Sequence, residues 1–389
     1  MPFPLKGPLK TWYFDVTDYA PVLKGNKQIT MGGGGQWQED MDIKFLFIVG
    51  TPPRDVLEMQ QIWRHQSKGY GSIIADNAFE PRDVLMHPNA TAYKLRTTIT
   101  GHGQEGEFIP QNHTINIDGG SVDYTWQVWT ECAENPIFPQ GGTWIYDRAN
   151  WCPGKRAQAF DHDITTHITA GDSIELNIDF QSYSWSGTQT PSYIIECQLF
   201  QYENANFSNS VEIIDIIKPS LKDEYSRKNP ICGKPLITIR NYGSSPLTAL
   251  DIEYKVVGGS IHTYNWIGNL AFLETEDIEL PNLSNWAGSE NTFEVILSNP
   301  NGQIDDYTAN NTMQSEFEQV PEYPENFVLF VNTNSGAIGS SQISETSWDF
   351  YNENDNIDKD KNLKNFNFSF YLGFGVWGLG FGVWGLGFG

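Results

Sequence analysis

Short stretches of alternating apolar and polar residues recur through the first half of the chain. A period of two places every second side chain on one face of a β-strand, so each stretch predicts a strand with one buried face. Residues 56–65 differ, because their charged and apolar positions suit a partly helical linker. The strands predicted in this half cover residues 11–16, 28–31, 42–49, 94–100, 113–117, 124–129, 173–180 and 193–202.

After residue 206 the alternating stretches become shorter and more evenly spaced. Turn-forming segments such as Asn241-Tyr-Gly-Ser-Ser-Pro246 separate them, which is typical of a small β-sandwich. We therefore predict an immunoglobulin-like sandwich over residues 208–320 that serves spacing or stability. Its strands are predicted at residues 213–217, 235–241, 250–257, 275–280 and 292–297.

The end of the chain has a different pattern. Leu372-Gly-Phe-Gly-Val-Trp-Gly378 is repeated without change from Leu379, and its frequent glycines disfavour a helix. We predict a disordered low-complexity tail over residues 372–389, with a glycine-rich membrane or self-association segment as the alternative. Residues 321–371 are predicted to be a linker or an incomplete further region.

Composition supports an all-β protein and limits its partners. The 389 residues exceed one ordinary domain, and 36 Gly, 21 Pro and 14% aromatic residues favour short strands joined by tight turns. A formal net charge of -24 repels a phosphate backbone and anionic lipids. Neither nucleic acid nor a membrane surface is therefore an expected partner.

The stretch Asn135 to Gly154 carries the candidate chemistry. It contains three Pro and three Gly, which prevent regular structure, together with Trp144 and Trp151, too many aromatics for a solvated linker. An ordered loop that presents Trp, Tyr, Asp and Arg suits a polar ligand with flat apolar faces, above all a sugar.

This loop and several segments around it resemble the peptide-N-glycosidase F family, in the family's order and at nearly its spacing. The resemblance covers roughly residues 9 to 205. It implies an enzyme that cleaves the amide bond between asparagine and the first N-acetylglucosamine of an N-glycan, with N-glycoproteins or glycopeptides as partners. The matching residues are Asp15-Val-Thr-Asp18, Gly50-Thr-Pro52, Leu95-Arg-Thr-Thr-Ile-Thr-Gly101, His113-Thr-Ile115, Cys132, Asn135-Pro136, Asp147-Arg-Ala-Asn-Trp-Cys-Pro-Gly154 and Phe180-Gln-Ser182.

The resemblance also implies a fold of tandem jelly-roll sandwiches. Residues 1–52 are expected to form the C-terminal part of an incomplete first jelly roll, and residues 53–207 the second. Cys132 and Cys152 are predicted to form a disulfide, from their spacing and the family match. Cys197 and Cys232 are expected to be free or buried, with a second bridge as the alternative.

Within the resemblance, Glu107 corresponds to one of the family's catalytic-site acids, with a solvated loop acid as the alternative. Arg148 and Trp151 correspond to its glycan-contacting Arg and Trp, although an ion pair of Arg148 with Asp147 is also open. Trp37 falls near another substrate-contacting Trp. His102 stands where the family can have a Trp, and Phe108 where it has one. Trp126 and Trp129 are predicted to belong to the core.

The family's principal catalytic Asp belongs to a segment upstream of this chain, and its second substrate-binding acid corresponds to Gly34 or Gly35. We therefore expect residues 1–389 alone to show little or no deglycosylation, unless an acid such as Asp118 or Asp147 substitutes. Residues 1–10 contain no signal peptide. Met1 is interpreted as a false or alternative start, because the resemblance begins partway through the family's first domain. The protein is expected to be secreted or periplasmic.

Two other functions remain open. One is a non-catalytic glycan-binding or adhesion module, which the missing Asp favours. The other is a copper-dependent monooxygenase, whose tandem jelly-roll architecture is similar. His162 and His167, five residues apart in a polar stretch, form the only close pair among seven histidines, and no His-x-His occurs, so no metal and no cofactor is predicted.

Overall fold

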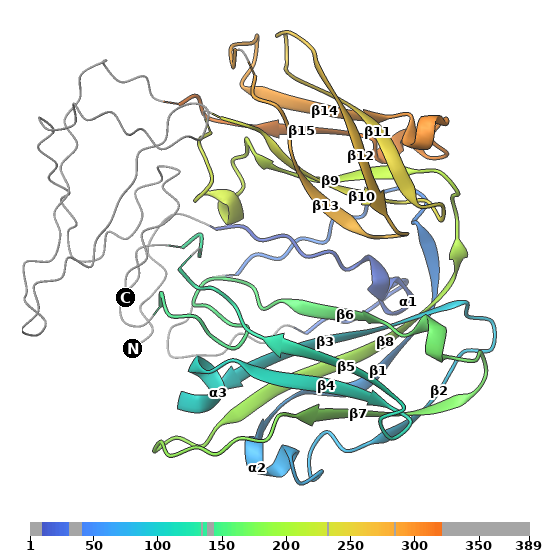
Figure 1. The fold of residues 1–389 in the computed structure, drawn as a ribbon, viewed down its shortest axis with the longest axis vertical. Helices are drawn as coiled ribbons and strands as arrows, with labels where there is room; N and C mark the ends of the chain where they lie inside the picture. Colours follow the sequence, from blue (N-terminus) through green and yellow to red (C-terminus); the bar gives the residue numbers. More distant parts are fainter. Residues whose placement is uncertain are drawn as a thin grey trace, which may run out of the picture. The chain divides into compact units, whose positions relative to one another are not determined.

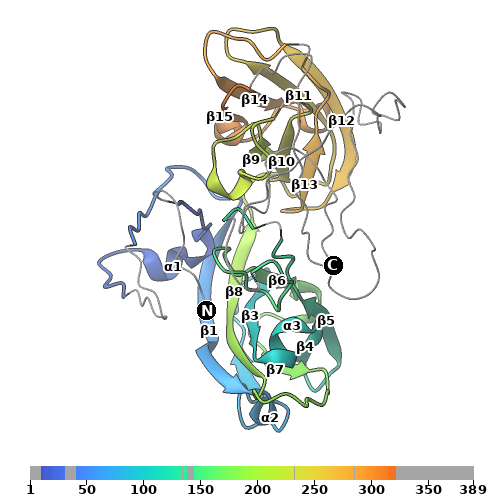
Figure 2. The same cartoon turned by 90° about the vertical axis from the view of Figure 1, so that its left-hand side faces the viewer.

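The computed structural model describes residues 10–30, 41–133, 135–137, 144–231, 233–283 and 285–320 (Figures 1 and 2). The chain divides into two compact units, Met1–Ile137 with Gly141–Ser208, and Phe138–Gln140 with Asn209–Gly389. Antiparallel sheets and a hydrophobic cluster of its own make up each unit. The prediction of an all-β fold is confirmed.

The first unit contains two four-stranded sheets, with the strand orders β1-β8-β3-β6 and β2-β7-β4-β5. Eight strands in which the first pairs with the last and the second with the seventh make a jelly roll. The strands are β1 (Arg54–Gly69), β2 (Arg82–Leu85), β3 (Ala92–His102), β4 (Gln111–Ile117), β5 (Val122–Val128), β6 (Ala159–Asp163), β7 (Ser173–Phe180) and β8 (Ser192–Ala205). The short helices are η1 (Thr17–Tyr19), α1 (Ala20–Leu23), α2 (Tyr70–Ile73), α3 (Gln104–Phe108) and η2 (Thr165–His167).

The core of this unit follows the alternation of its strands. Every second residue of β3 is buried, and Leu95, Ile99 and Ile115 have no exposed surface. Each such side chain contributes on the order of 1.5–3 kcal/mol by leaving water. Trp126 packs against this cluster from its edge, as predicted for a core residue. Trp129 is half-buried and lies outside the cluster, because β5 ends one residue before it.

The N-terminal segment corrects the sequence-based interpretation. No strand forms over the described residues 10–30 and 41–53, where three were predicted. Residues 17–23 form η1 and α1 instead, and Asp18 makes ion pairs with Lys94 and Arg96 at 2.7 and 3.2 Å. A strand needs a hydrogen-bonded neighbour, and none of the described strands pairs with residues 42–49. The side chains of Phe47 and Ile48 are exposed in this segment.

The prediction of a partly helical linker over residues 56–65 is also wrong, because these residues lie inside the long strand β1. Four irregularities interrupt the pairing of β1 with β8, between Arg54 and Gln66. Each bulge shifts the face on which the following side chains lie, so the apolar positions of β1 do not alternate in the sequence. β2 and β6, strands of four and five residues, were not predicted.

The second unit is a sandwich of two sheets, with the orders β13-β10-β9 and β12-β11-β14-β15. β12 and β15 were not predicted; the other five strands were. Its classification as immunoglobulin-like stays a prediction. The strands are β9 (Val211–Lys218), β10 (Leu236–Asn241), β11 (Leu247–Val256), β12 (His262–Leu270), β13 (Thr275–Glu279), β14 (Thr292–Ser298) and β15 (Thr312–Glu316), with short helices η3 (Asp223–Tyr225), η4 (Pro300–Gly302) and η5 (Thr308–Asn310).

Candidate functional site

The candidate site begins where β3 runs into α3. A side chain at Gly101 would clash with the Gly106 carbonyl oxygen and would place its Cβ 2.7 Å from that of Ala149. The close approach lets backbone amides join three segments: Gly101 N–H donates to Ala149 O at 3.0 Å, and Ala149 N–H donates to Glu107 O at 2.9 Å. Glycine is therefore required here, and α3 is fixed against the loop that carries Arg148.

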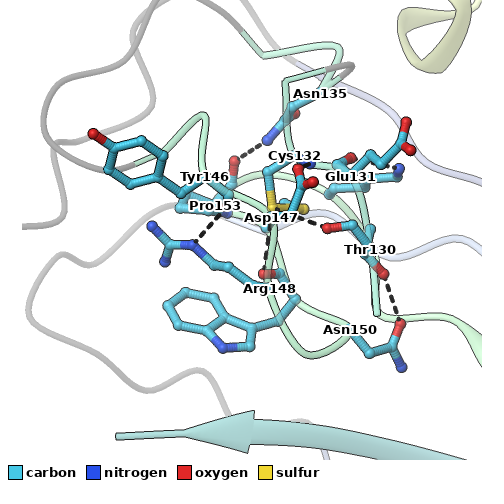
Figure 3. Close-up of a disulfide and its surroundings, with 12 residues drawn as sticks. Thr130, Glu131, Cys132, Asn135, Tyr146, Asp147, Arg148, Asn150 and Pro153 are labelled. Carbon is cyan, nitrogen blue, oxygen red and sulfur yellow. Dashed lines mark hydrogen bonds between the residues drawn. A yellow bond between two sulfur atoms is a disulfide. The ribbon is translucent and has the colours of Figure 1, made fainter. Parts of the chain in front are cut away.

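That loop is closed by the predicted disulfide, Cys132–Cys152, with 5.4 Å between the two Cα atoms. Thr130 and Arg148 exchange backbone hydrogen bonds of 2.8 and 3.0 Å beside it. Figure 3 shows Thr130, Cys132 and Arg148 together, with Asp147 next to Cys132. The Asp147 carboxylate accepts a hydrogen bond from Cys132 N–H at 3.2 Å and so helps to hold the loop.

Asn150 joins the loop to the sheet. Its backbone is left-handed (φ 59°), and its side chain is 1% exposed. The side-chain amide donates to Ile99 O at 2.9 Å and to Gln158 O at 2.7 Å, while its oxygen accepts from Gln158 N–H at 2.9 Å. Asn tolerates this conformation better than most residues, and its amide can donate to two carbonyls at once.

The central contact of the site is an ion pair between Arg148 and Glu107. Arg148 Nη1 donates to Glu107 Oε1 at 3.0 Å, and the two side chains are 5% and 16% exposed. Glu107 Oε2 has no hydrogen-bond partner in the described part of the chain. Burial raises the pKa of the Glu107 carboxyl, and the guanidinium of Arg148 offsets part of that rise. Burial also lowers the pKa of Arg148, and Glu107 opposes that change.

Aromatic rings surround the guanidinium. Its central carbon lies 4.6 Å from the ring centroid of Trp151 and 5.0 Å from that of Phe108, which are cation–π distances. Trp151 Nε1 donates to Gly101 O at 2.9 Å. The His102 ring stacks on Trp151 at 5.5 Å, and burial lowers the pKa of His102, so the imidazole is neutral at pH 7. These contacts orient a cation, a carboxyl group and three rings at one place.

The structure thus brings together four of the five residues singled out from the sequence: Glu107, Arg148, Trp151 and His102. Trp37 lies outside the described residues. The ion pair of Arg148 is with Glu107, whereas Asp147 bonds to the loop backbone. Phe108, Asn150 and Gly101 were not identified as contributors to the site. Asn150 lies within the matched motif, but its bonds to Ile99 and Gln158 span the fold and cannot be seen in sequence.

Two other proposed features have different surroundings. Asp118 lies in the turn after β4, at the end away from α3, where its carboxylate accepts from Glu175 N–H at 2.9 Å. His162 packs on Trp126 at 4.5 Å and His167 on Tyr124 at 6.2 Å. Among the described residues, no group of three or more His, Cys, Asp or Glu side chains is placed to hold a metal ion. Over the same residues, no helix has the length and apolar character to cross a membrane.

Comparison with known proteins covers the same region. Residues 69–199 match the family model described as peptide-N-glycosidase F, C terminal. A curated protein from Elizabethkingia miricola, peptide-N(4)-(N-acetyl-beta-D-glucosaminyl)asparagine amidase F, is 25% identical over 199 residues, 46% of this chain and 55% of its own length. Residues 69–199 are therefore similar to the C-terminal part of peptide-N-glycosidase F. The chain spans about half the length of that curated relative.

Solved structures of peptide-N-glycosidase F are also similar to this chain. A crystal structure of the amidase at 2.2 Å is 24% identical, covers 41% of this chain and 56% of its own, and has a TM-score of 0.36. The enzyme from Flavobacterium meningosepticum is 23% identical, covers 41% and 55%, and has a TM-score of 0.34.

Proposed function

We propose that this chain is a member of the peptide-N-glycosidase F family, and that it binds the core of an N-linked glycan next to its asparagine, at a peptide-N-glycosidase-like site formed by Glu107, Arg148 and Trp151. The observation that carries the proposal is the buried Glu107–Arg148 pair beside Trp151, within the residues that match the family. The name of the relative from Elizabethkingia miricola gives a glycosylated asparagine as that protein's substrate.

The chemistry of the cluster suits this ligand. A guanidinium held in plane by aromatic rings donates in a fixed fork to sugar hydroxyls or to the acetamido oxygen. Glu107 Oε2 can accept from a hydroxyl, or, in the protonated form that its raised pKa favours, donate to the scissile amide. Burial strengthens both contacts, because water competes less for the partners.

Hydrolysis of the amide would add water across the bond between the asparagine carbonyl carbon and its nitrogen. The carbon gains hydroxyl, the nitrogen gains a proton, and aspartate and a glycosylamine result. Glu107 would polarise the bond, and a second group must activate the water. The Asp147 and Asp118 carboxylates each accept a hydrogen bond from a backbone amide, of Cys132 and of Glu175, and so have structural roles. For residues 1–389 the geometry therefore supports glycan binding better than turnover, which keeps the non-catalytic glycan-binding alternative.

The test is calorimetric titration of the folded chain with a chitobiosyl-asparagine peptide and with the same peptide without sugar. We expect saturable binding of the glycopeptide alone, and at least a tenfold loss in Arg148→Gln, since hydrogen bonds to charged groups contribute about 1.5–3 kcal/mol. Arg156→Gln is the matched control, because it removes the same charge from an exposed position. Equal binding by wild type and Arg148→Gln would refute the site.

Mass spectrometry of the same mixtures separates binding from turnover, because hydrolysis converts the glycosylated asparagine to aspartate. We expect bound but uncleaved glycopeptide with residues 1–389. Efficient conversion that Glu107→Gln abolishes would contradict the expected lack of turnover and would support the full amidase function.

A further inference from the structure

A second candidate contact lies on the other side of α3, in the connection between β7 and β8. Figures 1 and 2 show this connection on the side of the first unit that carries α3. Gly106 packs on Pro191, where an added Cβ would lie 3.1 Å from that of the proline. The Glu105 carboxylate accepts from both Ser186 N–H and Gly187 N–H at 3.2 Å. α3 therefore contacts Arg148 through Glu107 and the β7–β8 connection through Glu105.

Glu105 fixes the shape of that connection. Its Oε2 atom is buried and has no hydrogen-bond partner in the described part of the chain, and it would lie 3.2 Å from a Cβ added at Gly187. Two amides on one carboxylate oxygen hold the turn at a defined position, and leaving the other oxygen without a partner costs stability.

The turn presents Trp185, which is 39% exposed. Its ring meets Tyr70 edge-on at 5.8 Å, and Tyr70 is fully buried and stacked on Tyr183 at 4.1 Å. Tyr183 in turn shares a 2.8 Å hydrogen bond with the Tyr193 hydroxyl. Trp185 thus stands at the exposed end of a rigid aromatic stack and outside the buried cluster.

The surroundings of Trp185 indicate the chemistry of its ligand. Residues 181–191 contain no charged side chain. The side chains of Ser184, Ser186, Thr188 and Gln189 are exposed and make no hydrogen bond with any described residue. An exposed indole in a connection that also carries free hydroxyl and amide groups suits an uncharged ring with many hydroxyls, which is a pyranose.

We propose that Trp185 is a second sugar contact, which binds a pyranose in the outer part of an N-glycan whose core occupies the Glu107–Arg148 site. The proposal rests on the proposed function of that site. Contacts link the two places: Trp151 stacks on His102, and His102 pairs in register with Ser192, the residue after the β7–β8 connection. Glu105 acts as a positioning residue, which holds the turn that presents Trp185.

The experiment titrates three ligands into wild type and Trp185→Ala: a chitobiosyl-asparagine peptide, the same peptide with a complete branched N-glycan, and the bare peptide. The variant should bind the complete glycan about threefold to tenfold more weakly and the chitobiosyl peptide as wild type does, which is the range expected for one aromatic stacking contact. Glu105→Gln should weaken the binding of the complete glycan and leave the affinity for the other two ligands unchanged. Phe14→Ala, which removes another exposed aromatic ring of this unit, should bind all three ligands as wild type does.

Thermal melting of each variant establishes that it is folded. Equal affinity of Trp185→Ala and wild type for the complete glycan would overturn the second contact while leaving the Glu107–Arg148 site intact. A matching loss for the bare peptide would also overturn it, because the indole would then contact peptide. Failure of wild type to bind the chitobiosyl peptide would contradict the proposed function, and this inference with it.

Discussion

At the scale of single residues, the site depends on side chains that each make several contacts at once. Arg148 pairs with Glu107, contacts Trp151 and Phe108, and pairs through its backbone with Thr130. Such a guanidinium cannot be replaced by lysine without loss, because a point charge lacks both the planar fork and the ring contact. The raised pKa of Glu107 and the lowered pKa of Arg148 have the same cause, which is the removal of both groups from water.

His113 provides a prediction at this scale that concerns stability. It is fully buried against Phe180 and Tyr193, and neither ring nitrogen has a partner in the described residues. Burial lowers its pKa to about 3. The unfolded chain binds a proton near pH 6.5 and the folded chain does not, so the free energy of unfolding falls as the pH drops below 6.5. The loss at pH 5 from this residue alone is about 2 kcal/mol.

His113→Leu should remove that part of the acid destabilisation. Urea unfolding at pH 7.5 and pH 5 measures the difference between the two conditions for wild type and variant. Exposed His65 gives a matched control, because its side chain is hydrated in both states. If His113→Leu shows the same pH dependence as wild type, the protein does not keep this imidazole neutral in its core.

At the scale of elements, the loop between Cys132 and Cys152 is held by one covalent bond and a few backbone contacts. The disulfide spans a sequence separation of 20 residues, and restricting the unfolded chain over such a loop contributes about 3 kcal/mol. We predict that Cys132→Ser/Cys152→Ser lowers the free energy of unfolding by this amount and weakens glycan binding, since Arg148 and Trp151 lie within the loop.

Denaturant unfolding with and without reductant checks this prediction. Reductant should destabilise wild type to the level of the double variant and leave the variant unchanged. Equal stability of oxidised wild type and the double variant would show that backbone contacts such as the Thr130–Arg148 pair alone hold the loop.

The elements also mark the limit of sequence analysis. β3, β4 and β7 were predicted because each has one face in the core, and that burial dictates alternation. β8 was predicted from the alternation at its start, although its residues 197–202 are all buried. β1 was not predicted, since its bulges break the alternation. The strands predicted before residue 50 carry a strand pattern but have no paired neighbour in the described structure, and pairing is a property of the fold that a local pattern cannot supply.

The same reasoning applies to the site. Arg148 and Trp151 were found because they lie in one matched motif, and Glu107 because the family places an acid there. The partner of Arg148 was not found, since Glu107 is 41 residues away and Asp147 is adjacent in the sequence. Gly101 and Asn150 were missed because their roles arise only when α3 and the disulfide loop meet.

At the scale of the whole molecule, one jelly roll carries the proposed site, and a separate sandwich follows it in the chain. The net charge of -24 disfavours anionic ligands, whereas neutral sugars avoid this repulsion. In the described part of the chain, Arg148 is the basic side chain beside Glu107, and no further basic cluster surrounds the pair. This charge distribution also fits a neutral polar ligand. Secretion, the absence of nucleic-acid partners and the glycan substrates remain predictions.

The most direct test of the account follows the indole N–H signals of the protein by NMR during titration with the chitobiosyl-asparagine peptide. Trp151→Phe assigns the Trp151 signal, and Trp266, buried in the second unit, serves as an internal control. We predict a saturable shift of the Trp151 signal, no shift of the Trp266 signal and no shift of either with the bare peptide. A Trp151 signal that stays in place while the glycopeptide binds, or that moves equally with the bare peptide, would contradict the proposed glycan site.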